Sequence, residues 1–145
     1  MIIYTIGFTQ KSAKQFFELI KKNKICSLID VRLNNQSQLA GFTKGRDLPY
    51  FLKNIADCEY YHELDFAPTE DILKDYKKGV ITWDEYEKRF HKLVVGRDMP
   101  GIFERKYGRL ENTVLLCSEV TAQQCHRRLV AEAISEKYGY KIIHL

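Results

Sequence analysis

The chain has 145 residues, of which 45% are hydrophobic and 29% are charged. Compact domains usually contain about 100–200 residues, so we expect a single globular domain over residues 1–145. The 8 glycines and 3 prolines exclude a collagen-like or linker-dominated chain. No apolar run approaches the roughly 18 residues that a membrane span needs. The formal net charge of +4 permits an anionic partner without requiring one.

The N-terminal segment and the cysteines indicate the compartment. The first residues lack the basic region and the small-residue cleavage site of a signal peptide. The four cysteines form neither a Cys-x-x-Cys pair nor a zinc-finger pattern. We therefore expect a cytoplasmic protein with reduced thiols and no membrane association.

The N-terminal half alternates between apolar runs and amphipathic segments. Residues 2–6 and 25–31 are continuous apolar runs of strand length, and between them Ser12 begins a helix with a capping box. Residues 33–47 have no hydrophobic period, which leaves two interpretations, a binding loop or a disordered surface loop. A helix then begins at Asp47, with a proline two residues later.

The middle of the chain continues this alternation. A third strand at residues 59–63 is followed by two helices that we expect to end at Gly79 and Gly96. A further helix over about 98–107 precedes a fourth strand at residues 113–117. The helix before Gly96 has an aromatic stripe that we assign to the core, comprising Trp83, Tyr86 and Phe90.

The C-terminal segment completes the pattern. We expect its helix to be the longest, capped by Thr121 and Gln124 and ending at Gly139, before a fifth strand at residues 141–144. Continuous apolar strands that alternate with amphipathic helices are typical of parallel strands covered on both faces. The sequence therefore predicts an α/β fold, a three-layer sandwich around a mainly parallel sheet of about five strands.

Reactive side chains concentrate where the predicted strands end. In open parallel sheets, ligands bind beyond the carboxyl ends of the strands, so these positions nominate a site. From the strand ends and the segments after them, the candidates are Gly7, Asp30, Arg32, Cys117, Glu119, Cys125, His126 and Arg127.

Asp30 and Arg32 flank Val31, so in a strand both point to the same face. One interpretation is an internal ion pair that fixes the following loop. The other is an arginine that binds an anionic ligand, beside a carboxylate for acid–base or metal chemistry.

The segment after the fourth predicted strand contains most of the candidate residues with reactive or charged side chains. A helix that begins after Thr121 would present free N–H groups and a positive dipole to a phosphate, together with Arg127. The same field would lower the pKa of Cys125 and make it a reactive thiolate, the alternative being an inert packed thiol. His126 faces the predicted sheet, either as a structural hydrogen-bonding group or as a catalytic one.

The spacing of the cysteines, arginines and histidine argues against several known types of catalytic or metal site. A cysteine-phosphatase loop needs an arginine six residues after the cysteine, and Gln123 stands there when the count begins at Cys117. The same position disfavours a sulfurtransferase loop. Cys117, Cys125 and His126 could bind a metal, but their spacing is unusual and adjacent Cys and His side chains diverge on a helix, so we assign no metal site. Neither a phosphate-binding Walker loop nor a dinucleotide-binding glycine motif is present.

Several segments together resemble a known family. These are Tyr-Thr-Ile-Gly at 4–7, Leu-Ile-Asp-Val-Arg at 28–32, Leu-Leu-Cys-Ser-Glu at 115–119, Cys-His-Arg-Arg at 125–128 and Ile-His-Leu at 143–145. In this order they resemble the prokaryotic domain-of-unknown-function family 488, whose activity is not settled. The resemblance implies a compact α/β domain and adds Thr5 and His144 to the motif positions. Members commonly carry His-Ser after the first glycine, where this chain has Phe8 and Thr9.

The leading hypothesis is an anion site for a phosphate-bearing ligand, such as a nucleotide or a nucleic acid, with no cofactor assigned. Arg32 and Arg127 would bind the phosphate, and Thr5, Gly7 and Cys117 would complete the ligand site. Asp30, Glu119, Cys125 and His126 are the candidate catalytic residues if the protein is a hydrolase or transferase, and whether it is an enzyme stays open. Two alternatives are a redox sensor built on Cys125 and a non-catalytic nucleic-acid-binding or regulatory module using the loop residues Phe42, Lys44 and Arg46.

Overall fold

Five parallel strands form one sheet at the centre of the molecule. The computed structural model describes residues 1–36, 40–119 and 121–145. The strand order is β3-β2-β4-β1-β5, and all four neighbouring pairs are parallel. The strands are β1 (Ile2–Gly7), β2 (Ser27–Asp30), β3 (Glu59–His62), β4 (Thr113–Cys117) and β5 (Lys141–His144). This confirms the predicted parallel sheet and the five strands that we expect from the sequence.

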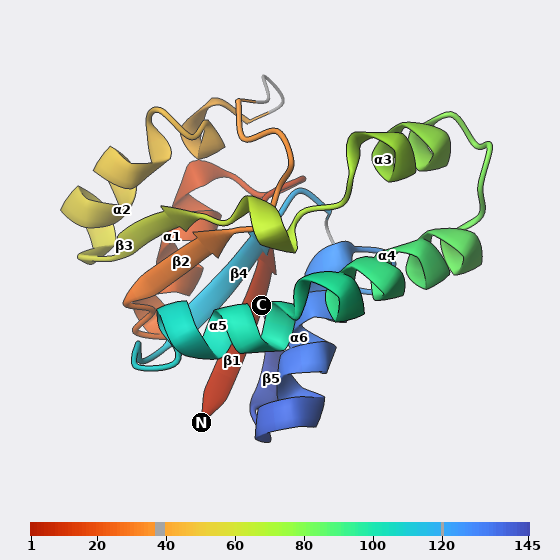
Figure 1. Ribbon diagram of the computed structural model, residues 1–145. Helices are drawn as coiled ribbons and strands as arrows, with labels where there is room; N and C mark the ends of the chain where they lie inside the picture. The colour runs from red at the N-terminus through yellow and green to blue at the C-terminus, as the bar shows by residue number, and fades with distance from the viewer. Residues whose placement is uncertain (37–39, 120) are drawn as a thin grey trace.

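Helices cover both faces of this sheet and give three layers (Figure 1). The helices are α1 (Ala13–Lys22), α2 (Leu48–Ala56), α3 (Glu70–Lys77), α4 (Trp83–Arg97), α5 (Met99–Tyr107) and α6 (His126–Tyr138), with short 3-10 turns at Gly41–Thr43 and Leu64–Phe66. Helices α1 and α2 pack on one face, and α4, α5 and α6 pack on the other. The predicted three-layer α/β sandwich is therefore confirmed.

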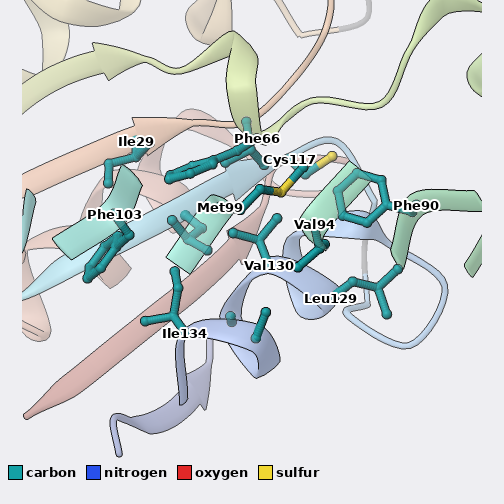
Figure 2. Close-up of a cluster of buried hydrophobic side chains, with 14 of the residues drawn as sticks. Ile29, Phe66, Phe90, Val94, Met99, Phe103, Cys117, Leu129, Val130 and Ile134 are labelled. Carbon is teal, nitrogen blue, oxygen red and sulfur yellow. The ribbon is translucent and has the colours of Figure 1, made fainter. Parts of the chain in front are cut away.

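The three central strands, β1, β2 and β4, are almost entirely buried because both of their faces are covered, whereas the edge strands β3 and β5 are partly exposed. Successive side chains of β4 enter opposite cores: Val114 and Leu116 face α1 and α2, whereas Leu115 and Cys117 face α4 to α6. Figure 2 shows the core between the sheet and helices α4 to α6, in which Cys117 lies among aliphatic and aromatic side chains. The alternation thus places the thiol of Cys117 on the α4–α6 side, at the carboxyl end of β4.

The beginning of α6 differs from the prediction. The helix begins at His126 and its N-cap is Cys125, so the expected cap at Thr121 is wrong. The preceding residues form a connection whose backbone is bound elsewhere, since the carbonyl of Ser118 accepts from the backbone N–H of Thr9. With 13 residues, α6 is also shorter than α4, which has 15.

Two further boundaries concern α4 and the long loop. Helix α4 continues through Gly96 to Arg97 and ends where Asp98 adopts a left-handed conformation, with φ 52°. Within the loop expected at 33–47, residues 37–39 lie outside the described residues, and the described parts are bound into the fold. The backbone of Gly45 donates to the carbonyl of Asn35, for example.

In the described part of the chain, none of the helices combines the length and the apolar character that crossing a membrane requires.

Candidate functional site

A cleft of about 230 Å³ opens at the carboxyl ends of the central strands. Phe8 follows β1, Arg32 follows β2 and Cys117 ends β4, and all three line the cleft. The start of α6 and side chains from α3 and α4 complete the lining. This is the position that the parallel-sheet rule predicts for a ligand site, because strand β4 lies between β1 and β2 and brings their ends together.

Asp30 and Arg32 form a buried ion pair at the edge of this cleft. Arg32 Nε lies 2.9 Å from Asp30 Oδ1, and Arg32 Nη2 lies 2.7 Å from Oδ2. The backbone N–H of Arg32 and the hydroxyl of Tyr60 also donate to the Asp30 carboxylate, at 3.1 Å and 2.7 Å. The internal ion pair that one interpretation expected is therefore present, and four donors occupy the carboxylate of Asp30.

One nitrogen of the buried Arg32 guanidinium is left without a hydrogen-bond partner among the described residues. Burial opposes its charge, but the hydrogen bonds to Asp30 raise the pKa of Arg32 above its ordinary value. Its carbon Cζ lies 5.1 Å from the ring centre of Phe8, a cation–π contact. Among the described residues, the buried Nη1 atom has no hydrogen-bond partner. Phe8 thus packs against the arginine of this site.

Cys117, Cys125 and His126 converge at the floor of the cleft. His126 Nδ1 lies 3.6 Å from Cys117 Sγ, and His126 Nε2 lies 2.7 Å from the carbonyl oxygen of Val31. A carbonyl only accepts, so Nε2 carries the proton and Nδ1 faces the sulfur. The three side-chain ligand atoms lie within 4.8 Å of one another, and all three residues are buried.

The pKa values of the two thiols are shifted in opposite directions. A hydrogen bond from the Cys125 thiol lowers the pKa of Cys117, although burial opposes the charge. Burial and the neighbouring Cys117 sulfur raise the pKa of Cys125 well above its ordinary value. A redox sensor built on Cys125 requires a lowered pKa, so its surroundings do the opposite of what that alternative needs.

Glu119 lies in the cleft as the sequence implied, whereas Arg127 does not. Glu119 is exposed and lines the cleft. Arg127 is 1% exposed, is not among the lining residues, and donates from Nη1 to the backbone carbonyl of Glu119 at 2.8 Å. Arg127 therefore holds the connection before α6. The prediction that it joins Arg32 around a phosphate, at a helix end after Thr121, finds no support in this geometry.

Thr5 and Gly7 likewise do not line the cleft. The Thr5 hydroxyl lies 2.6 Å from Nδ1 of His144, which joins β1 to the neighbouring β5. A side chain at Gly7 would collide with the Glu119 carbonyl, so this glycine allows the connection before α6 to pass close to β1. Of the nine candidates, the structure gathers Arg32, Cys117, Glu119, Cys125 and His126 in the cleft, with Asp30 behind Arg32.

Sequence reasoning missed an aromatic wall on the other side of the cleft. Tyr76 of α3 and Trp83 and Tyr86 of α4 all line it. The rings of Trp83 and Tyr86 are stacked, with centres 4.8 Å apart and planes at 18°. The helical stripe that was assigned to the core continues into the cleft, because Trp83 lies in the first turn of α4 and is only partly buried. Its position at the end of the stripe was the available signal.

The comparisons with known proteins give one family. No curated protein and no solved structure matches this chain. A family model described as domain of unknown function DUF488 matches residues 12–134, a range that contains the cleft residues from Arg32 to His126. The chain therefore belongs to the DUF488 family, as its motifs indicated.

Proposed function

We propose that the cleft binds a phosphate-bearing ligand with a planar base, of about the size of one nucleotide. The observation that carries this proposal is the buried Arg32 Nη1, a charged donor without a partner among the described residues, in a cleft with an aromatic wall. Leaving such a donor unsatisfied costs about 1–3 kcal/mol, and more for a charged group. A ligand oxygen would remove that cost and form a charge-assisted hydrogen bond.

The aromatic wall favours a planar group beside the anion. Trp83 is partly exposed, and stacking of a base on an aromatic side chain is worth about 1–3 kcal/mol. Lys77, which is exposed and also lines the cleft, adds a second cation. The volume of about 230 Å³ lies below the roughly 300–1,000 Å³ of common ligand pockets, which favours a mononucleotide over a dinucleotide.

The alternative of a nucleic-acid-binding loop has less support. Its aromatic residue, Phe42, is only partly exposed and packs against Phe16 and Phe17, with ring centres 5.5 Å and 6.0 Å away. A ring held in the core in this way is not free to stack on a base. The cleft therefore remains the better candidate for contact with a nucleotide.

The groups that could act on such a ligand are the thiol and imidazole groups at the floor and the carboxylate of Glu119. Hydrolysis or group transfer is the reaction class to test first. Binding and catalysis are separate claims, and binding is the one that the geometry supports best.

Binding can be followed with the protein's own fluorescence, because Trp83 is the single tryptophan of the chain and lines the cleft. We expect adenosine and guanosine monophosphates to change its emission. The nucleosides, which lack the phosphate, and ribose 5-phosphate, which lacks the base, should bind more weakly. No change with any mononucleotide in fluorescence or calorimetry would refute the proposal.

A matched pair of variants localises the phosphate contact. Arg32→Lys keeps a positive charge but loses the guanidinium fork, and the loss of a charged hydrogen bond of about 1.5–3 kcal/mol should weaken binding roughly 10- to 100-fold. Arg109→Lys is the control, because Arg109 is exposed and precedes β4, at the amino end of the strand and away from the cleft at its carboxyl end. Equal affinities of the two variants would show that Arg32 does not bind the phosphate. Circular dichroism verifies that both variants fold.

A further inference from the structure

The floor of the cleft holds a cluster of soft metal-ligand types. Cys117 ends β4, and Cys125 and His126 begin α6, so two elements that are separated in sequence supply the three side chains. Their sulfur and nitrogen atoms lie within 4.8 Å of one another. Sulfur and imidazole nitrogen are the ligands that zinc prefers in proteins.

The distances fit a tetrahedral ion. Zinc–sulfur bonds of about 2.3 Å and zinc–nitrogen bonds of about 2.0–2.1 Å place a bound sulfur and a bound nitrogen roughly 3.5 Å apart. The observed separation of Cys117 Sγ and His126 Nδ1 is 3.6 Å. These two ligands therefore already have the spacing of a bound pair.

A second contact orients the histidine. His126 Nε2 donates to the carbonyl of Val31 at 2.7 Å, which leaves Nδ1, 3.6 Å from the Cys117 sulfur, as the ring nitrogen that can accept. Metal-binding histidines usually donate their other N–H to a carbonyl or a carboxylate in this way, which fixes both the tautomer and the ring.

Cys125 and His126 are adjacent, but only His126 lies within helix α6. Adjacent side chains diverge on a helix, but Cys125 is the N-cap and its backbone is extended, with φ −139° and ψ 136°. The turn from extended to helical backbone lets the side chains of Cys125 and His126 approach the same point. The objection from their adjacency therefore no longer holds.

We propose that Cys117, Cys125 and His126 bind a zinc ion at the floor of the cleft. Within the described residues the cluster has three members, so the fourth tetrahedral position is open. All three residues line the cleft, which places that position where a water molecule or a bound ligand can reach it. Three protein ligands with one open position are typical of catalytic rather than structural zinc. This inference concerns the ion alone and does not depend on nucleotide binding.

The test uses Co²⁺ as a spectroscopic probe for Zn²⁺, with reduced full-length protein and no nucleotide. Wild-type protein should bind one Co²⁺ per chain with thiolate-to-cobalt charge-transfer bands and the intense visible bands of tetrahedral cobalt. Zn²⁺ should displace these bands and raise the melting temperature. Added azide, which coordinates an accessible ion, should shift the visible bands.

Variants assign the ligands. Cys125→Ser and His126→Asn should lose the tetrahedral bands, whereas Cys26→Ser, which removes the exposed thiol, should keep them. Absence of the bands in wild-type protein, or their survival in both ligand variants, would overturn the proposal whether or not a variant is destabilised. Bands that azide leaves unchanged would refute the open position. Cobalt binding without any nucleotide effect on Trp83 would refute only the proposed function.

Discussion

The buried pair of Asp30 and Arg32 allows the sharpest prediction about stability. Asp30 is 0% exposed and accepts four hydrogen bonds, three of them from Arg32 and one from Tyr60. Asp30→Ala removes the countercharge and leaves a guanidinium that is only 4% exposed. Breaking a buried pair from one side costs about 3–5 kcal/mol, because the remaining charge is uncompensated. This is a large share of the roughly 5–15 kcal/mol that stabilises a typical domain.

Equilibrium urea unfolding, followed by circular dichroism at neutral pH, measures this cost. The matched control is Asp47→Ala, since Asp47 pairs with Arg46 on the surface, where both side chains are at least 44% exposed. Exposed pairs contribute about 0–1 kcal/mol, so the control should change the free energy of unfolding by no more than about 1 kcal/mol.

The double variant Asp30→Ala/Arg32→Met separates lost charge pairing from lost volume. It removes both charges of this pair and leaves neither uncompensated, so we expect it to be more stable than Asp30→Ala alone by about 1 kcal/mol or more. The reasoning would be refuted if Asp30→Ala cost no more than Asp47→Ala, or if the effects of the two buried substitutions simply added.

Three further predictions concern pH, backbone packing and thiol exposure. Burial opposes the charge of Glu63, but a hydrogen bond from Lys106 lowers the pKa of this carboxyl group. Ionised Glu63 therefore stabilises the fold above its unfolded pKa of about 4.3. This contribution disappears as the pH falls through the lower pKa of the folded state. Urea midpoints at neutral and acid pH should therefore differ more for wild type than for Glu63→Gln. Gly7→Ala should destabilise the protein by about 1–3 kcal/mol, because its new methyl group meets the carbonyl of Glu119, and an unchanged melting curve would contradict this. Iodoacetamide should label Cys26, the exposed thiol, before the three buried ones, and peptide mass mapping of a time course would reveal any other order.

Local pattern was sufficient for most of the secondary structure. Helix α1 begins at the predicted Ser12 capping box, and α5 occupies Met99–Tyr107 within the expected range. The continuous apolar runs became strands that are covered on both faces. These predictions succeeded because capping and periodicity depend on residues a few positions apart.

Prediction failed where a distant segment decides the backbone. The Thr121 signal resembles a helix cap, but the carbonyl of Ser118 accepts from Thr9 and that of Glu119 accepts from Arg127, which holds both residues in a connection. Helix α6 therefore begins at His126, four residues after the helix start that a cap at Thr121 predicts. No local pattern reports these contacts, since Thr9 comes from the far end of the chain.

The sequence by itself determined the class of fold, the family and the edge of the sheet where polar side chains gather. Only the tertiary structure decided which of them meet. The strand order places β4 between β1 and β2, so Cys117 comes beside Arg32, and α3 and α4 supply the aromatic wall. Asp30 pairs with Arg32 and Arg127 donates to the carbonyl of Glu119, whereas Cys117, Cys125 and His126 form one cluster. The reason is physical: composition and periodicity specify which residues are buried, but contacts between distant elements specify which of them become neighbours.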